Sequence, residues 1–251
     1  MKWELVCHFT RLIVEAEPDL VTMENGSQMV CHEVFGQLLQ SLSEYSVWYS
    51  VVECNAYGVP QTRKRLVLMV SRFGPISLLE PVLSRRKATV AAAIAKLPAL
   101  AAGERDLKDS MHHACNLSSL NLQRIRASQP GGIWRDWPAS LRSRCHQSPA
   151  GETFPSVYGR REWEKPALTI TNQCFGYGNE RFGHPVQDRA ITLREAAMVQ
   201  TFPRRYKFFP PKYKVVFSTM GRLIGNAVPV RSAYAIGRSF VDHTKAKVTT
   251  H

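Results

Sequence analysis

The sequence predicts an α/β protein with the last part of a doubly wound sheet and a second, smaller, loop-rich domain. Within the first 73 residues, segments with helical periodicity alternate with short apolar runs. The following stretch, 74–187, is rich in Pro, Gly, Ser and Arg and has few periodic segments. Helical periodicity returns after residue 188. Alternating helices and strands are typical of α/β sheets, and the middle stretch is typical of ordered loops.

The first domain, 1–73, is predicted to begin with an amphipathic helix, because apolar residues recur at helical spacing. The apolar run that follows predicts a buried strand ending at Glu24, Asn25 and Gly26. Polar side chains just past the carboxyl end of a strand lie where open α/β sheets bind ligands. The expected elements are a helix over 3–17, a strand over 19–23, a helix over 30–42, and strands over 47–52 and 65–71.

The middle domain, 74–187, is predicted to contain a short helix over 89–97 and a strand over 168–171. Its loops are rich in aromatic residues, which disordered linkers seldom carry, so we expect them to be ordered. In the last segment, 188–251, Thr192 and Glu195 form a capping box for a helix that runs to about residue 200. A basic, aromatic loop over 204–217 follows, and Gly225-Asn-Ala-Val-Pro229 introduces the last helix.

The chain has a net charge of +13, and its cations are clustered. Clustered cations interleaved with aromatic residues predict a polyanion partner, most simply nucleic acid, although a solvated basic surface explains charge alone equally well. The clusters are Arg63, Lys64, Arg65, Arg72, Arg85, Arg86 and Lys87; five arginines within 124–144; and Arg204, Arg205, Lys207, Lys212 and Lys214.

The six cysteines are scattered without paired spacing, which predicts reduced thiols in a cytoplasmic protein. The spacings typical of structural zinc sites are absent, so we expect no metal. No apolar run approaches the roughly 18 residues of a membrane span. The N-terminus lacks the apolar core of a secretory signal, and we expect neither membrane insertion nor secretion.

Arg63 and Arg65 follow a Gly-Val-Pro turn at the start of an apolar strand. Strand alternation predicts that both guanidinium groups point to the same face. Two planar forks on one face suit phosphate oxygens or the acceptor edge of a base. The alternative is a basic edge strand that its charges keep soluble.

Four blocks, in this order, resemble motifs of the C5-cytosine DNA methyltransferases. Met23-Glu-Asn25 resembles the family's ENV motif, and Gln61, Arg63 and Arg65 match its Q-x-R-x-R motif. The segments 189–203 and 222–229 resemble its final two motifs. The spacing also matches, with a variable stretch of about 115 residues between the second and third blocks, and a resemblance in four ordered blocks is specific. It implies a Rossmann-like sheet and a target-recognition domain at 74–187.

The resemblance also implies a reaction and roles for single residues. The family adds a cysteine thiolate to C6 of a flipped cytosine and transfers a methyl group from S-adenosylmethionine to C5. Glu24 matches the glutamate that assists at N3, and Arg65 matches the arginine that holds O2, with Arg63 in the same pocket. Asn25 and Gln61 match residues that order the site. Double-stranded DNA is the implied partner, in a restriction-modification context.

Gly225, Asn226 and Ala227 fall where the family's last motif walls the methionine end of the cofactor. Simple packing of small residues against the sheet is the alternative explanation for this segment. Residues 188–251 as a whole are expected to carry the closing motifs, a hinge helix and the return of the chain to the catalytic domain.

The family's front-half motifs do not occur in this sequence: there is no F-x-G-x-G loop and no Pro-Cys-Gln. The nucleophile is therefore absent, the cofactor site is incomplete, and Cys54 is expected to be a buried, inert thiol. We expect either one subunit of a split enzyme that needs a complementary N-terminal subunit, or a truncated product that is inactive alone. A transfer-RNA methyltransferase and a non-catalytic DNA-binding remnant are the competing hypotheses. The target DNA sequence is not predicted.

Overall fold

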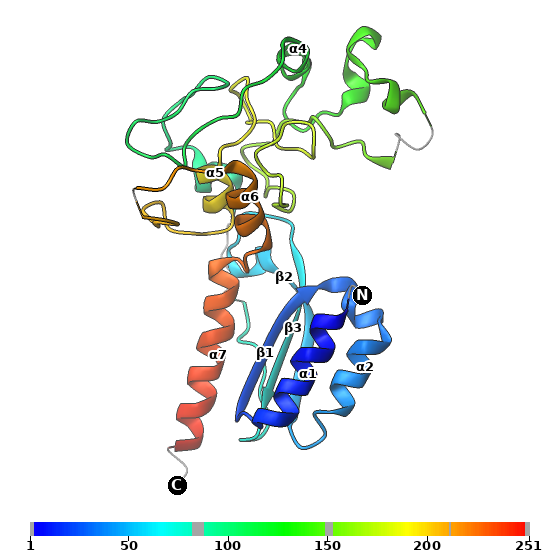
Figure 1. The fold of residues 1–251 in the computed structure, drawn as a ribbon, viewed down its shortest axis with the longest axis vertical. Coiled ribbons are helices and arrows are strands. Elements are labelled where there is room, and N and C mark those ends of the chain that lie inside the picture. Colours follow the sequence, from blue (N-terminus) through cyan, green and yellow to red (C-terminus); the bar gives the residue numbers. More distant parts are fainter. Residues whose placement is uncertain (1–2, 82–87, 149–152, 211, 249–251) are drawn as a thin grey trace. The chain divides into compact units, whose positions relative to one another are not determined.

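The computed structural model describes residues 3–81, 88–148, 153–210 and 212–248. The chain divides into two compact units, which are described separately. The sheet unit comprises Met1–Tyr57, Arg63–Leu83 and Arg231–His251, and the loop unit comprises Gly58–Thr62 and Ser84–Val230. Figure 1 shows the elements of each unit. The predicted basic residues Arg85, Arg86 and Lys87 lie outside the described residues.

Three strands form the sheet of the sheet unit, in the order β1-β3-β2. The strands are β1 (Leu20–Gly26), β2 (Ser46–Glu53) and β3 (Lys64–Ser71), so the three predicted strands are confirmed with small shifts of their ends. The central strand, β3, runs antiparallel to both neighbours. Its apolar run is buried on both faces, as the uninterrupted hydrophobic sequence predicts for a covered strand. The α/β class is confirmed; a complete doubly wound sheet stays a prediction.

Helices cover both faces of this sheet. Leu66, Leu68 and Val70 of β3 pack against α1 (Glu4–Ala16) and α2 (Glu33–Gln40). Val67 and Met69 point to the opposite face, where α7 (Val230–Val248) contributes Ile236. Figure 1 shows α1 and α2 on one side of the sheet and α7 on the other. Strand alternation thus sends neighbouring residues of β3 into two separate cores.

Within the described residues, β1 is hydrogen-bonded to a strand on one side alone, so the sheet ends there. An unpaired strand edge presents free backbone donors and acceptors to another chain. None of the described helices is long and apolar enough to cross a membrane.

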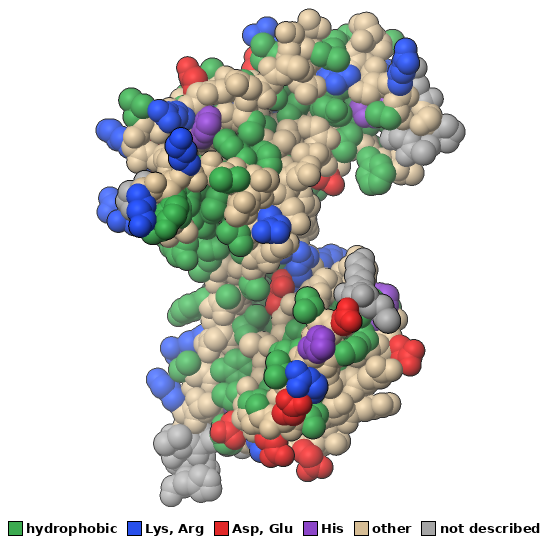
Figure 2. Space-filling view, viewed as in Figure 1, with side chains coloured by type: hydrophobic (Ala, Val, Ile, Leu, Met, Phe, Trp, Pro, Cys, Tyr) green, Lys and Arg blue, Asp and Glu red, His purple; other side chains and the backbone are tan. Residues whose placement is uncertain are grey.

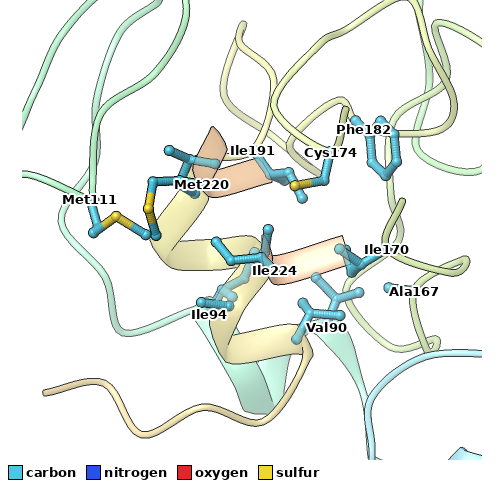
Figure 3. Packing of buried hydrophobic residues seen from close by; sticks show 14 residues of the cluster. Val90, Ile94, Met111, Ala167, Ile170, Cys174, Phe182, Ile191, Met220 and Ile224 are labelled. Carbon is cyan, nitrogen blue, oxygen red and sulfur yellow. The ribbon is translucent and has the colours of Figure 1, made fainter. Parts of the chain in front are cut away.

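The loop unit is organised around α5 (Leu193–Val199) and α6 (Phe217–Asn226), with α3 (Val90–Ile94) packed against α5. Its core gathers residues from segments that are far apart in the sequence, including Val90, Met111, Ile170, Phe182, Ile191 and Ile224 (Figure 3). The remaining helix is α4 (Ser119–Ala127). Short 3-10 turns occur at Ser27–Cys31, Cys54–Tyr57, Trp134–Asp136, Ala139–Leu141 and Arg144–Gln147.

Buried arginines hold the loops of this unit together. Arg160 donates to the backbone carbonyls of Ile125, Ser128, His184 and Gln187 and to the carboxylate of Asp188. A guanidinium group has five N–H donors in a fixed fork, so one side chain can satisfy several loop carbonyls at once. Two further arginines have the same kind of role: Arg189 makes a bidentate ion pair with Glu195, and Arg124 donates to Leu141, Asn121 and Ser143.

Several predictions for the loop unit need correction. The predicted strand over 168–171 is wrong; instead Ala167 forms an isolated bridge with Gln61, and the Gln61 side chain accepts the N–H of Ile170. Two helices, α4 and α6, were not predicted. The capping box of Thr192 and Glu195 is confirmed. The chain passes from one compact unit to the other after residues 57, 62, 83 and 230. The predicted domain boundaries after residues 73 and 187 stay a prediction.

Candidate active site

Glu24 of β1 and Arg65 of β3 meet at one end of the sheet. The register pairs Gly26 with Arg65 and Glu24 with Val67, so Glu24 and Arg65 are diagonal neighbours on adjacent strands. The Arg65 Nε lies 3.0 Å from the Glu24 Oε1. The side chain of Glu24 is 14% exposed and that of Arg65 is 22% exposed. The result is an ion pair that is largely withdrawn from water.

Arg63 lies one residue before β3 and is buried, with 2% of its surface exposed. Its carbonyl accepts the backbone N–H of Cys54 at 2.9 Å, which fixes the turn into the strand. Burial, with help from the charge of Arg65, lowers the pKa of Arg63 to about 10, while Glu24 opposes this change. Arg63 is therefore still a cation at neutral pH, and it is close enough to interact electrostatically with both Glu24 and Arg65.

Burial raises the pKa of the Glu24 carboxyl, and this effect outweighs the attraction of Arg65 and Arg63, which acts in the opposite direction. A carboxyl with a raised pKa retains its proton to a higher pH than an ordinary glutamate. The three side chains thus combine a carboxyl of raised pKa with two guanidinium groups. That combination suits a ligand with a basic ring nitrogen next to a carbonyl oxygen.

A small cavity of about 10 Å³ lies beside this group. Its polar lining comes from Glu24, Cys54, Tyr57, Arg65 and Ser232, and the rest of the lining is apolar. Such a volume holds about one water molecule, so the cavity is not itself a pocket for a base. Cys54 is 2% exposed, and burial raises the pKa of its thiol. The prediction of a buried thiol at Cys54 is confirmed, and a neutral buried thiol is a poor nucleophile.

The residues predicted to order the site differ in what they contact. Asn25 lies next to Glu24 on β1, and its Oδ1 accepts the N–H of Gly26 at 2.8 Å. Gln61 belongs to the loop unit, is fully buried, and donates to the Oε1 of Gln200 at 2.7 Å. Asn25 therefore shapes the strand end that carries Glu24, whereas Gln61 joins the segment before Arg63 to the helices of the loop unit.

Gly225, Asn226 and Ala227 lie at the carboxyl end of α6, in the loop unit. A Cβ on Gly225 would stand 2.6 Å from the carbonyl oxygen of Thr171, so this glycine is needed for close packing. Asn226 is exposed. The structure therefore groups Glu24, Arg63 and Arg65 in one unit and places these three residues in the other.

Gln200 was not among the predicted site residues. Its Nε2 donates to the carbonyls of Ile224 and Ala227, and its Oε1 accepts from Gln61, so one amide connects α5, the end of α6 and the segment 58–62. Gln61 and Gln200 are 139 residues apart, and no local pattern signals that they pair. The one hint in the sequence is that both residues belong to segments that resemble family motifs: Gln61 to the Q-x-R-x-R motif and Gln200 to the segment 189–203.

The sequence model of the C-5 cytosine-specific DNA methylase family matches residues 2–242. The chain belongs to this family. Type II methylase M.HgiDII of Herpetosiphon aurantiacus is 49% identical over 244 residues, covering 95% of the chain and 69% of that protein. Type II methyltransferase M1.HphI of Haemophilus parahaemolyticus is 30% identical over 238 residues, covering 92% of the chain and 59% of that protein. The methylase chain thus spans between about three-fifths and seven-tenths of these relatives.

Similarity to a solved structure extends the relationship to the fold. A protein of Escherichia coli described as a prophage-encoded DNA modification methyltransferase superposes with a TM-score of 0.69 at 19% identity. The match covers 95% of this methylase chain and 73% of the solved chain. At this level of identity the comparison supports the fold alone, and the α/β architecture agrees with it.

Proposed function

We propose that this methylase chain provides the cytosine-holding part of a type II DNA (cytosine-5) methyltransferase of a restriction-modification system. The observation that carries the proposal is the buried Glu24–Arg65 ion pair with Arg63 beside it. A carboxyl of raised pKa next to two guanidinium groups matches the Watson–Crick edge of cytosine, whose N3 and O2 are neighbouring acceptors. The target cytosine would leave the duplex to reach these groups.

In this proposal each of the three side chains has a separate task. Burial raises the pKa of the Glu24 carboxyl, which favours a hydrogen bond or proton transfer from it to N3 and makes C6 easier to attack. Arg65 donates to O2 and orients the Glu24 carboxyl. Arg63 supplies a second positive charge that stabilises electron density as it develops on the ring. Residues 74–187 are proposed as the target-recognition domain that reads the DNA.

S-adenosylmethionine would supply the methyl group when bound. Of the three residues proposed to contact it, Asn226 alone has an exposed polar side chain, while Gly225 is explained by its packing on Thr171. Gly225, Asn226 and Ala227 are thus at most one wall of a cofactor site. The remaining walls and the nucleophilic thiol must come from residues other than those described here.

A segment that carries the front-half methyltransferase motifs is part of the proposal, because these motifs would supply the nucleophilic cysteine and the rest of the cofactor site. The open edge of β1 gives such a segment a place to pair. The alternative is a non-catalytic DNA-binding protein. Cys54 favours this alternative, because the cysteine beside Glu24 is buried and its raised pKa keeps it neutral.

Complementation tests the proposal. The chain is mixed with the part of M.HgiDII that lies outside the matching region, and transfer of labelled methyl groups to duplex DNA is measured. We expect activity that neither part has alone, and a loss of about 10²–10⁴-fold in the variant Glu24→Gln. Arg65→Ala is expected to lower activity as well.

The exposed ion pair of Lys64 and Glu53 provides the matched control. It joins neighbouring strands of the same sheet, as the Glu24–Arg65 pair does, but more than 60% of each side chain is exposed. Glu53→Gln and Lys64→Ala should change restored activity by less than about twofold, since exposed pairs contribute little. Equal losses in the control and site variants would refute the assigned roles. DNA binding without any restored methyl transfer would favour the non-catalytic alternative.

A further inference from the structure

A groove of about 670 Å³ lies in the loop unit, and none of the candidate active-site residues lines it. One wall is formed by 106–111, the other by 204–209, and Leu97, Pro98 and Arg194 complete the lining. The wall over 204–209 lies outside the predicted recognition domain. It contains part of the basic stretch that the sequence singled out and that the proposed chemistry does not use.

The walls of the groove are held together from within by Arg194. Its guanidinium group makes a bidentate ion pair with Asp109, at 2.6 and 3.1 Å, and donates to the carbonyl of Tyr206 at 3.2 Å. It also lies over the ring of Phe208, 5.7 Å from the centroid. Arg194 is 5% exposed, so these contacts are shielded from water. One buried side chain thus fixes both walls, and the groove is preformed.

The rim of the groove carries cations that are not used inside the protein. Arg204, Arg205 and Lys207 are exposed, and so is Lys108 on the facing wall. Among the residues that the structure describes, none of these four makes an ion pair. Figure 2 shows Lys and Arg side chains gathered on the side of the loop unit where Figure 1 draws the chain between α5 and α6.

The acidic residues of the groove do not cancel this charge. Asp109 is paired with Arg194, and Asp106 leaves one negative charge against the four exposed cations. Apolar side chains lie between the cations: Leu107 is 91% exposed and Tyr206 is 45% exposed. Exposed cations interleaved with apolar side chains in a concave surface are typical of nucleic-acid contacts, in which phosphates meet the cations and sugars meet the apolar groups.

We propose that this groove binds the phosphodiester backbone of double-stranded DNA, as a contact surface additional to the recognition domain. This inference rests on the proposed function, because it takes duplex DNA as the partner. A single phosphate would need one convergent pocket, whereas these cations are spread along two walls and suit successive phosphates of one strand. The groove therefore anchors the DNA backbone and carries no sequence information.

The test compares two triple variants of the full chain that lose the same charge. The groove variant is Arg204→Ala/Arg205→Ala/Lys207→Ala, and the control variant is Lys212→Ala/Lys214→Ala/Arg222→Ala. The control cations are exposed, belong to the same unit, and do not line the groove. Binding to a duplex oligonucleotide is measured by fluorescence anisotropy from 50 to 200 mM salt, and circular dichroism checks that each variant is folded.

Each lost phosphate contact should flatten the plot of log affinity against log salt by about 0.9. For the groove variant, the magnitude of the slope of log affinity against log salt should therefore fall by nearly 3. Between 50 and 200 mM salt its affinity should then decrease about 40-fold less than that of the wild type. The control should keep the wild-type slope within about 1. If the wild type binds DNA and both variants have equal slopes, the proposal that the groove binds the DNA backbone is overturned while the proposed function stays intact. No duplex binding by the wild type would overturn both.

Discussion

Replacing Arg161 of the loop unit by an apolar residue should stabilise the protein. It is 1% exposed, and none of its three guanidinium nitrogens has a hydrogen-bond partner among the described residues. Its favourable contacts are the ring of Phe182, 5.3 Å from the guanidinium carbon, and the more distant charges of Glu195 and Glu180. Because Glu195 is already paired with Arg189, it compensates little of this buried charge.

The magnitude follows from the burial. Removal from water lowers the pKa of Arg161 from 12.5 to about 10, which corresponds to about 3 kcal/mol at about 1.4 kcal/mol per tenfold change. The cation–π contact with Phe182 offsets about 0.5–2 kcal/mol of this cost. Replacing buried ionic groups by apolar side chains of similar size is often stabilising by about 1–4 kcal/mol. We therefore expect Arg161→Met to raise the free energy of unfolding by about 1–3 kcal/mol.

Urea denaturation followed by tryptophan fluorescence, together with thermal melting, measures this change. For a protein of this size, 1 kcal/mol corresponds to about 2–4 °C in the melting temperature. Arg161→Lys keeps the charge and should not be stabilising. Arg126→Met removes an equal charge from the surface, where the Arg126 side chain is 63% exposed, and should change stability by less than about 1 kcal/mol. A destabilised Arg161→Met protein would show that Arg161 has a partner in solution, and the argument from burial would fail.

Three further predictions concern packing, a buried amide and pH. Gly225→Ala should lower the free energy of unfolding in urea by about 1–3 kcal/mol, because the added Cβ would meet the Thr171 backbone. The control is Gly36→Ala in α2, where the added Cβ meets open space and the change should be neutral or stabilising. Gln61→Ala should lower the free energy of unfolding by about 2–4 kcal/mol in the same assay, because the Oε1 of Gln200 and the N–H of Ile170 lose the hydrogen bonds that Gln61 makes. A loss below about 0.5 kcal/mol would contradict the bridging role of Gln61. The raised pKa of Glu24 means that the folded state binds more protons than the unfolded state above about pH 4.5, so this contribution to stability falls as pH rises. Denaturation of Glu24→Gln at several pH values should therefore show its stability improving relative to the wild type from pH 4.5 upward, and a constant difference would count against the raised pKa.

The elements that were predicted correctly are those in which one local pattern decides the structure. The apolar run of β3 is buried on both faces, so its hydrophobicity alone locates the strand. The helix α5 is capped by Thr192: its side chain accepts the backbone N–H of Glu195, and the Glu195 side chain accepts the backbone N–H of Thr192. The pattern that identifies each element lies within the element itself, so the sequence is sufficient to locate both.

The two helices that were missed carry residues that obscure helical periodicity. In α6, Gly221 and Gly225 reduce helix propensity, yet a Cβ on either would stand 2.6 Å from a backbone oxygen of Asn172 or Thr171. In α4, Arg124 points inward and donates to the carbonyl of Leu141, so a cation occupies a position where the pattern requires an apolar residue. Contacts with distant segments decide both helices, and a local pattern cannot anticipate such contacts.

The same distinction applies to the net charge. We took the clustered arginines in the sequence as a sign of a polyanion partner. The structure, however, uses several arginines internally: Arg124 of these clusters, and Arg160 and Arg189 outside them, hold loops through hydrogen bonds. A cation that already donates to carbonyls or a carboxylate has little left to offer a phosphate. The charge argument therefore applies only to exposed cations that lack ion pairs, and Arg204 and Arg205 meet that condition within the described residues. Composition indicates a class of partner, but only the hydrogen-bond partners of each arginine indicate which cations are left to contact it.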